Sequence, residues 1–336
     1  MKPVCIAIDA MGGDYAPLET VKGGYEAANK LGCKIIFVGD EVKIQKVINE
    51  NKLKANPDLI EIYHTDKEIP MGEKDPARAA RREKDASIVV ANRLVAEGKA
   101  DAVIAAGNTG VATIASLFTL KRLEGFERPC ICTLIPTSRS KMFLIDGGSN
   151  IEPTPEQIVQ NAVIGKLLSK ILFKNDNARV GLLNVGEEES KGNELYRETY
   201  QLLKNHPGIN FIGNVEGKTI IDDICEIAVC DGFIGNIHLK ALEGGLKIFA
   251  EQIKDKLKQG SFLTKIAALI LKNSSVFEEI KAHVHPNSYG GALLGGVNGV
   301  SIISHGSSSS EAIYNACRNA KLFVEEDVIN ALKAEL

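Results

Sequence analysis

The chain has 336 residues, of which 44% are hydrophobic, enough apolar material for a large core in one big α/β domain or two joined lobes. Its 40 basic and 43 acidic residues leave a net charge of −3, and aromatic residues make up only 5% with no Trp, which argues against a general nucleic-acid-binding protein. No apolar stretch reaches the roughly 18 residues of a membrane span, and the N-terminus does not have the pattern of a signal peptide, so we expect a cytoplasmic location.

Strand-like and helix-like segments alternate from the first residues onward. In chain order we expect a strand at 4–8, a helix at 18–31, a strand at 34–38, a helix from Val42, a strand at 59–63, a basic helix start at 77–84, a helix through 89–97 and a strand at 102–106. This alternation predicts an α/β fold with a mostly parallel sheet and helices on both faces.

The pattern changes in the middle of the chain and then resumes. Residues 130–135 and 142–145, joined by the turn-forming 136–140, predict a hairpin or adjacent strands. After it we expect a helix at 155–172, strand 180–183, helix 193–205, strands 210–212 and 227–229, a helix after Asn236, strand 299–303 and helix 309–332. Without a repeat or a linker, 1–336 is predicted to be one domain of two lobes that share a continuous sheet.

One segment near the C-terminal end has an amphipathic pattern. At 100° per residue, one wide face of 262–280 includes Phe262, Leu263, Ile266, Leu269 and Ile270. The opposite side is polar, and the preceding Lys254, Lys256 and Lys258 are basic. This pattern predicts a helical protrusion over 254–282 that contacts an anionic membrane surface. Packing of the same face on the protein's own core or on a partner subunit remains an alternative.

Four short polar loops each follow a strand-like segment and precede a helix-like one. They are 9–14, 107–110, 184–186 with the following 191–193, and 231–236. Glycine permits close backbone approach, and the free N–H groups at a helix start attract anions. Ligands of open α/β sheets bind at the carboxyl ends of the strands, so we expect the loops along one sheet edge. The set predicts a site for phosphate and a polar acyl carrier, although each single loop also fits an ordinary turn.

These loops belong to a longer series of motifs that runs nearly end to end. The series is Asp9-Ala-Met-Gly-Gly-Asp14 with Ala16-Pro17, Ala106-Gly-Asn-Thr-Gly110, Gly181-Leu-Leu-Asn-Val-Gly186, Lys191-Gly-Asn-Glu194, Phe211-Ile-Gly-Asn-Val-Glu216, Asp231-Gly-Phe with Gly235-Asn236, Tyr289-Gly-Gly-Ala292 and His305-Gly-Ser-Ser308. Each motif is weak alone, but together and in this order they closely resemble the bacterial phosphate acyltransferases of phospholipid synthesis.

The resemblance implies an activity, a fold and partners. The activity is conversion of acyl–acyl carrier protein and orthophosphate to acyl phosphate, which a glycerol-3-phosphate acyltransferase then uses in phosphatidic acid synthesis. The implied fold is that of the isocitrate and isopropylmalate dehydrogenases and the phosphotransacetylases. The implied assembly is a homodimer attached peripherally to the inner face of the cell membrane. The chemistry requires no cofactor.

The sequence departs from the family pattern in three places. Tyr15 stands where the family usually has His, so we assign no proton-transfer role there. Asp146-Gly-Gly-Ser-Asn150 replaces the usual Asp-Val-Gly-Ala-Asn, and Asn287-Ser288 reverses the common order before Tyr289. The roles of these positions are therefore left open.

Attack of phosphate on a thioester needs a bound phosphate and donors for the tetrahedral oxyanion. Lys191 is the first candidate for the charged donor, with a solvated surface lysine as the alternative. Asn236 is the candidate amide donor, and it is also consistent with a helix N-cap. Further candidates for binding phosphate and substrate are Asn108, Thr109, Gly110, Asn184, Gly186, His305, Gly306, Ser307 and Ser308.

A basic run at Arg78, Arg81, Arg82 and Lys84 is the candidate contact for the acidic carrier protein, or else a solvated helix face. No metal site is expected: the seven cysteines lack zinc-site spacing and predict buried reduced thiols, and Asp222-Asp223 is interpreted as a helix cap. Two other functions remain open. One is an NAD-dependent decarboxylating dehydrogenase on the same fold, although no Gly-x-Gly-x-x-Gly fingerprint is present. The other is a non-catalytic scaffold for the carrier protein at the membrane.

Overall fold

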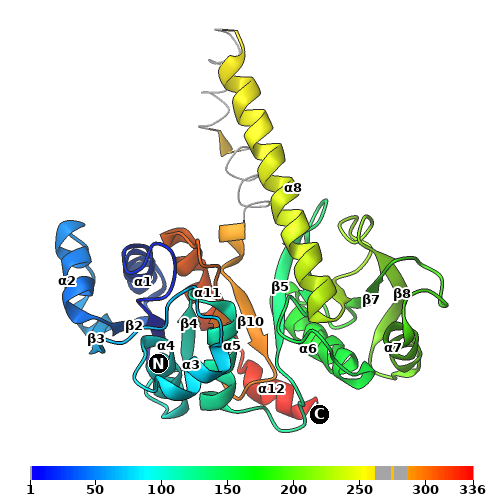
Figure 1. The fold of residues 1–336 in the computed structure, drawn as a ribbon, viewed down its shortest axis with the longest axis horizontal. Helices are drawn as coiled ribbons and strands as arrows, with labels where there is room; N and C mark the ends of the chain where they lie inside the picture. Colours follow the sequence, from blue (N-terminus) through cyan, green and yellow to red (C-terminus); the bar gives the residue numbers. More distant parts are fainter. Residues whose placement is uncertain (1, 262–273, 276–285, 336) are drawn as a thin grey trace.

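The computed structural model of the chain describes residues 2–261, 274–275 and 286–335. A single 11-stranded sheet runs through both halves of the described structure (Figure 1). Across the sheet the strands are β3 (Ile60–His64), β2 (Lys34–Gly39), β1 (Cys5–Asp9), β4 (Ala102–Ala105), β11 (Val300–Ile303), β10 (Ala292–Gly295), β5 (Cys130–Pro136), β6 (Lys141–Ile145), β9 (Ile227–Val229), β7 (Arg179–Asn184) and β8 (Asn210–Glu216). Its neighbouring strands are mostly parallel, as predicted.

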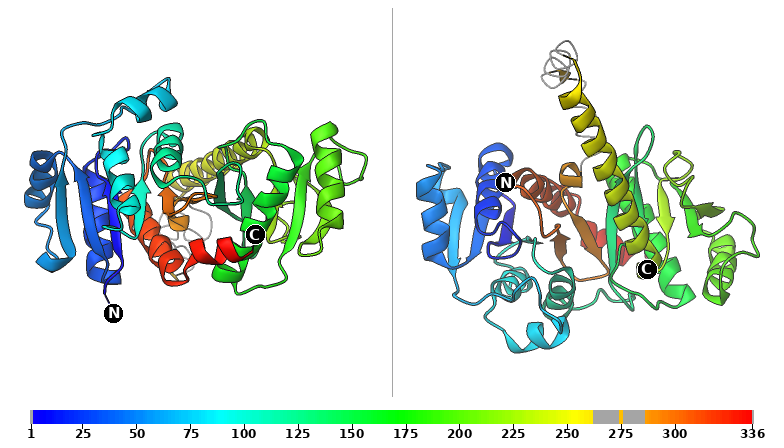
Figure 2. Two further views of the ribbon diagram at one scale, coloured as in Figure 1. Left: turned by 90° about the horizontal axis from the view of Figure 1, so that it is seen from below. Right: turned by 45° about the horizontal axis from the view of Figure 1, so that its top comes forward.

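Helices cover both faces of this sheet (Figure 2). They are α1 (Leu18–Leu31), α2 (Glu41–Glu50), α3 (Pro76–Arg82), α4 (Ser87–Ala96), α5 (Thr109–Leu120), α6 (Pro155–Phe173), α7 (Glu194–Asn205), α8 (Gly232–Gln259), α11 (Ser310–Glu325) and α12 (Val328–Ala334), with short 3₁₀ turns η1 (Pro57–Leu59) and η2 (Pro286–Tyr289). Alternation along the strands divides the core: Ile6 and Ile8 face the cluster under α1 and α11, whereas Cys5 and Ala7 face the cluster under α4 and α5. A third cluster packs under α8.

The direction of the strands reverses in the middle of the sheet. β10 is antiparallel to both of its neighbours, and β5 and β6 form an antiparallel hairpin, one of the two arrangements predicted for this segment. β6, β9, β7 and β8 are parallel to one another and therefore run opposite to β1, β4 and β11. The expectation that all four polar loops share one sheet edge is therefore wrong. Loops 9–14 and 107–110 follow β1 and β4, whereas loops 184–186 and 231–236 follow β7 and β9, which run in the opposite direction.

The register nevertheless brings the oppositely directed strand ends together. Pairing aligns five residues in one row across the central strands, namely Ile104, Ile302, Leu293, Cys132 and Ile145. β4 and β11 end just beyond this row in one direction, and β6 ends at it in the other. The loops that follow these three strands therefore meet over the middle of the sheet.

Several other expectations need correction. The strand β10 was not predicted, because four residues between glycines carry no alternation. The predicted helix over 309–332 is two helices, since Asp327 has a φ of +49° between α11 and α12. Asp223 caps no helix; its carboxylate accepts hydrogen bonds from the Thr137 and Ser138 hydroxyls.

The helix α8 begins in the body and its C-terminal part extends away from the sheet (Figure 1). The residues predicted to contact the membrane, Phe262, Leu263, Ile266, Leu269 and Ile270, lie outside the described residues, as does most of the predicted protrusion. Among the described residues, no helix is both long and apolar enough to cross a bilayer.

Candidate active site

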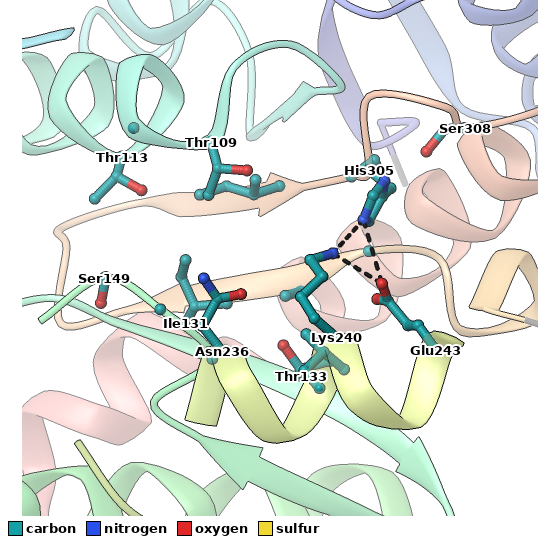
Figure 3. A pocket seen from close by; sticks show the side chains of 18 of the residues that line it. Thr109, Thr113, Ile131, Thr133, Ser149, Asn236, Lys240, Glu243, His305 and Ser308 are labelled. Carbon is teal, nitrogen blue, oxygen red and sulfur yellow. Dashed lines mark hydrogen bonds and ion pairs between the residues drawn. The ribbon is translucent and has the colours of Figure 1, made fainter. Parts of the chain in front are cut away.

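A cavity of about 620 Å³ lies over the central strands, between the N-terminal parts of α5 and α8. Its size is within the range of roughly 300–1,000 Å³ typical of small-molecule sites. The floor is largely apolar and comes from the sheet and from α5 and α8; it includes Ile114, Ile131, Ile135, Leu239, Leu242 and Ile303. Polar side chains from α5, from α8 and from the loops after β6 and β11 surround this floor (Figure 3).

The first turn of α5 forms one side of the cavity. Asn108 caps the helix, because its Oδ1 accepts a hydrogen bond from the Val111 N–H at 3.1 Å. Its Nδ2 donates to the carbonyl oxygen of Met71 at 2.8 Å, so the Asn108 side chain is occupied by structural contacts. Thr109 and Gly110 line the cavity at the positive end of the helix dipole. This end of α5 is therefore a suitable contact for an anion.

Two buried hydroxyl groups in the cavity wall have no hydrogen-bond partner among the described residues. They are Thr113 Oγ1, one turn into α5, and Ser304 Oγ, just after β11. Thr113 is 8% exposed and Ser304 is 2% exposed. A buried hydroxyl without a partner costs free energy, and such groups often mark a position where a ligand or water binds.

The loop after β6 is held rigidly by the buried carboxylate of Asp146. This carboxylate accepts hydrogen bonds from the backbone N–H groups of Ile131, Gly148, Ser149 and Asn150, at 2.8–3.0 Å. Burial raises the pKa of the Asp146 carboxyl despite these hydrogen bonds. The Asp-Gly-Gly-Ser-Asn variant of this loop thus forms a fixed backbone surface in the cavity wall.

The start of α8 packs directly on this loop. Asp231 caps the helix by accepting from the N–H groups of Phe233 and Ile234, and it accepts from the Tyr196 hydroxyl at 2.7 Å. The N-cap alternative for Asn236 is therefore wrong: Asn236 is the fifth residue of α8. Its side chain is exposed, makes no hydrogen bond with the described residues and lines the cavity.

The face of α8 that begins at Asn236 carries two charged residues that the sequence analysis missed. Lys240 and Glu243 follow at helical spacing, and both line the cavity. The Lys240 ammonium lies 2.8 Å from Glu243 Oε2 and 2.6 Å from Nε2 of His305, in the loop after β11 (Figure 3). The sequence signal was present, because positions 236, 240 and 243 share one helical face.

The loop 304–308 supplies the remaining predicted residues at the cavity. His305 and the buried Ser308 line it, whereas Gly306 and Ser307 are adjacent but do not. The Gly306 carbonyl oxygen accepts from the Asp14 N–H at 2.8 Å, so the loop 9–14 supports 304–308 from behind. Of the sequence-predicted residues, the cavity thus brings together Thr109, Gly110, Asn236, His305 and Ser308.

The loop after β7 lies beyond the cavity lining. Lys191 is about half exposed and its ammonium is 3.8 Å from the Glu188 carboxylate. The nearly buried Asn184 donates to the Lys191 carbonyl oxygen at 3.3 Å and to Asn214 Oδ1 at 3.1 Å, which fixes the loop to β7 and β8. Gly186 contacts the Glu188 and Lys191 side chains and not the cavity. These three positions form a separate loop next to the capped start of α8.

Four basic residues, three in α3 and Lys84 just after it, lie close to the cavity mouth. Lys74, Asp75 and Pro76, which lead into α3, are part of the lining, and Pro76 packs on Gly110. Arg78, Arg81, Arg82 and Lys84 are exposed. The Arg81 guanidinium lies 4.6 Å from the centre of the Phe118 ring. This arrangement places a positively charged surface beside the entrance.

The cysteines are buried, and the described residues contain no cluster of three or more potential metal ligands. Burial raises the pKa of the Cys225 thiol to about 12 and that of Cys33 to about 11. These thiols are therefore uncharged core groups at neutral pH.

Solved structures with the same architecture identify the fold class. A phosphotransacetylase from Streptococcus pyogenes matches with a TM-score of 0.62 at 17% identity, covering 96% of this chain and 95% of that one. A 4-hydroxythreonine-4-phosphate dehydrogenase from Klebsiella pneumoniae matches with a TM-score of 0.53 at 14% identity, covering 96% and 98%. At these identities the similarity establishes an α/β fold shared with phosphotransacetylases, and the fold alone.

Sequence relatives then establish the family. A phosphate acyltransferase from Desulfitobacterium hafniense is 44% identical over 332 residues, covering 98% of this chain and 97% of the relative. A phosphate acyltransferase from Dictyoglomus turgidum is 42% identical over 324 residues, covering 96% and 95%. The family described as fatty acid synthesis protein matches residues 4–331, and the chain belongs to it. The predicted family is confirmed, and the chain is an enzyme of the acyltransferase class.

Proposed function

We propose that the cavity transfers the acyl group of an acyl–acyl carrier protein thioester to orthophosphate, which yields acyl phosphate and the free carrier thiol. The observation that carries this proposal is the two-part lining of the cavity. An apolar floor suits an acyl chain, and hydrogen-bond donors and a cation on its rim suit phosphate and a thioester carbonyl. Phosphotransacetylases, which share the fold, and the phosphate acyltransferases of the family are consistent with this chemistry.

In this mechanism a phosphate oxygen attacks the thioester carbon, and the C–S bond breaks as the carrier thiolate leaves. Phosphate binds between the start of α5 and the facing side of α8, where Thr109, Gly110 and Ser308 are among the lining residues. Asn236 donates its amide to the oxyanion that forms from the carbonyl oxygen, and such a donor is typically worth about 10²–10³ in rate. No cofactor takes part in these bond changes.

In this proposal Lys191 provides a further positive charge, outside the cavity lining. Its loop lies beside the start of α8, because Tyr196, at the beginning of α7, donates to Asp231. From this position Lys191 would attract the anionic substrates, with Asn184 and Gly186 fixing the loop. The carrier protein would dock on the α3 surface, where Arg78, Arg81, Arg82 and Lys84 meet its acidic face.

We propose a homodimer that is attached to the cytoplasmic face of the membrane and passes acyl phosphate to a glycerol-3-phosphate acyltransferase. Support comes from α8, where Ile248, Phe249 and Ile253 are exposed, with 45–66% of their surface accessible. These large apolar side chains continue toward the amphipathic segment, and such a surface favours a lipid or protein contact.

The test is formation of acyl phosphate from palmitoyl–acyl carrier protein and labelled orthophosphate. Wild type is expected to turn over, and Asn236→Ala is expected to lose about 10²–10³ in kcat while remaining folded. Asn49→Ala on α2, an exposed residue at the far edge of the sheet, is the matched control. Absence of turnover by the wild type with any acyl chain would favour a scaffold, and a melting temperature raised by NAD would favour a dehydrogenase.

A further inference from the structure

Lys240, Glu243 and His305 form a hydrogen-bonded cluster that crosses the cavity (Figure 3). Lys240 and Glu243 belong to α8, which follows β9, whereas His305 follows β11, so the cluster joins the two oppositely directed halves of the sheet. The Nε2 atom of His305 also lies 3.7 Å from Glu243 Oε2. The side chains of Lys240 and His305 are 49% and 54% exposed, so the cluster is open to the cavity.

The hydrogen bonds of the cluster define what each group can still bind. An ammonium group has three N–H donors and no acceptor. Two donors of Lys240 are directed to Glu243 and His305, which leaves one donor. Because Lys240 donates to His305 Nε2, this nitrogen is an acceptor and the proton of the neutral ring is on Nδ1, which faces Ser307 Oγ at 3.4 Å. In this arrangement His305 has no Nε2 proton to give to a substrate.

We propose that Lys240 is the cation that binds the attacking phosphate, and that Glu243 and His305 are positioning residues that hold its ammonium in the cavity. This inference rests on the proposed phosphate acyl transfer. Lys74 and Lys240 are the lysines among the described lining residues, and Lys74 lies at the exposed mouth. Lys240 instead lies one helical turn from Asn236, the proposed donor to the carbonyl oxygen. The phosphate and the carbonyl are thus held by neighbouring side chains of one helical face.

Lys240 remains protonated throughout the proposed step. The new bond joins a phosphate oxygen to the acyl carbon, and the electron pair of the C–S bond leaves with the carrier sulfur. The ammonium offsets the repulsion between the phosphate dianion and the forming oxyanion, so its effect requires a fixed position and no proton transfer. The hydroxyls of Thr113 and Ser304, which have no hydrogen-bond partner in the described part of the chain, supply uncharged donors in the same cavity.

The decisive experiment compares Lys240→Met with Lys247→Met in the acyl phosphate assay. Lys247 is exposed on the same helix two turns further on, outside the cavity lining. Loss of one charge-assisted hydrogen bond predicts a KM for phosphate raised about 10- to 100-fold in Lys240→Met, with a smaller change in the KM for acyl–acyl carrier protein. Lys247→Met is expected to match the wild type.

A Lys240→Met enzyme with an unchanged KM for phosphate would overturn this inference and leave the proposed function intact, provided that the wild type turns over. If the wild type does not turn over, the proposed function itself fails. Calorimetric titration with inorganic phosphate supplies a readout without turnover: the wild type is expected to bind and Lys240→Met to bind at least about tenfold more weakly. Equal binding by both proteins would also overturn the inference.

The positioning role of His305 is tested by a pair of variants. His305→Gln retains an acceptor for the Lys240 ammonium, whereas His305→Leu does not. We expect His305→Leu to raise the KM for phosphate and His305→Gln to restore most of the wild-type value, with kcat less affected in both. Equal KM values in the two variants would contradict the assignment of His305 as an acceptor.

Discussion

Replacement of Gly235 by Ala is expected to separate α8 from the loop after β6. A Cβ atom at Gly235 would lie 2.0 Å from the carbonyl oxygen of Asp146 and 2.9 Å from the Cys230 sulfur. Real Cβ contacts essentially never fall below 3.0 Å, so the helix and loop must move apart by at least about 1 Å. The loop cannot yield easily, because the Asp146 carboxylate is fixed by backbone donors from both sides.

The magnitude follows from this displacement. Forcing a methyl group into a packed contact costs about 1–3 kcal/mol of stability. A displacement of about 1 Å at Asn236, the residue next to Gly235, is expected to lower kcat by about 10²-fold, which corresponds to about 2.7 kcal/mol of transition-state stabilisation. The variant is therefore expected to lose more activity than a small loss of stability alone would cause.

Urea unfolding and acyl phosphate formation by Gly235→Ala measure the two effects. Gly244→Ala is the control, because it makes the same change in the same helix at a position where no atom of the described residues, apart from the helix's own backbone, lies within 4 Å of the added Cβ. That control is expected to gain about 0.5–1 kcal/mol of stability, since Ala favours a helix over Gly, with unchanged kcat. The reasoning would be refuted if Gly235→Ala retained wild-type stability and kcat.

Three further changes test other parts of the structure. Burial raises the pKa of Asp9 from 3.8 to about 6, so the ionised Asp9 destabilises the folded state increasingly as the pH rises through this window. Asp9→Asn should therefore raise the free energy of unfolding by as much as about 3 kcal/mol at pH 7.5 and by little near pH 4. An equal change at both pH values in urea unfolding would contradict this explanation. Tyr196→Phe removes the hydroxyl that donates to Asp231 and should cost about 1–3 kcal/mol in the same measurement, whereas Tyr200→Phe should cost little. Thr113→Val should stabilise the free protein by about 1 kcal/mol, because it removes a buried hydroxyl that has no partner among the described residues. It should also raise the KM for phosphate or for acyl–acyl carrier protein, and unchanged KM values for both would show that neither substrate uses this group.

Local patterns in the sequence predict most of the elements. The helix α1 was predicted over Leu18–Leu31 and the strand β9 over Ile227–Val229, which are their observed bounds. Both depend on regular hydrophobic spacing followed by a loop, and this information is local. The reversal of strand direction depends instead on β10, a short strand that pairs with β11, which follows it closely in the chain, and with β5, which is distant in the sequence. Sequence spacing does not reveal such partners, so the arrangement of the loops was predicted incorrectly.

The difference between local patterns and distant contacts also explains which residues of the candidate site were predicted from the sequence. The motifs led directly to Asn236 and His305, because glycine and polar residues after a strand mark a ligand-binding loop. Lys240 and Glu243 are in a regular helix, where a Lys–Glu pair usually indicates a solvated surface. Their place in the cavity depends on His305, which lies 65 positions along the chain from Lys240. Lys191, in contrast, lies in a loop after a strand, as ligand-binding residues often do. That strand is β7, which is next to β9 on the side away from the central strands, so the loop lies beyond the cavity lining.

The fold alone does not select acyl transfer. Solved structures that share it include a phosphotransacetylase and a dehydrogenase, so the shared sheet supports more than one chemistry. The choice depends on the side chains that the central strands and α8 present. A floor of aliphatic residues offers little to a nicotinamide ring, which needs polar groups to orient it, but it suits the acyl chain of the proposed substrate. The same lining contains the Lys240 ammonium, held by Glu243 and His305, and two hydroxyls without a hydrogen-bond partner among the described residues, and these groups fit a small anion. Together with the family assignment, this lining favours acyl transfer to phosphate over hydride transfer.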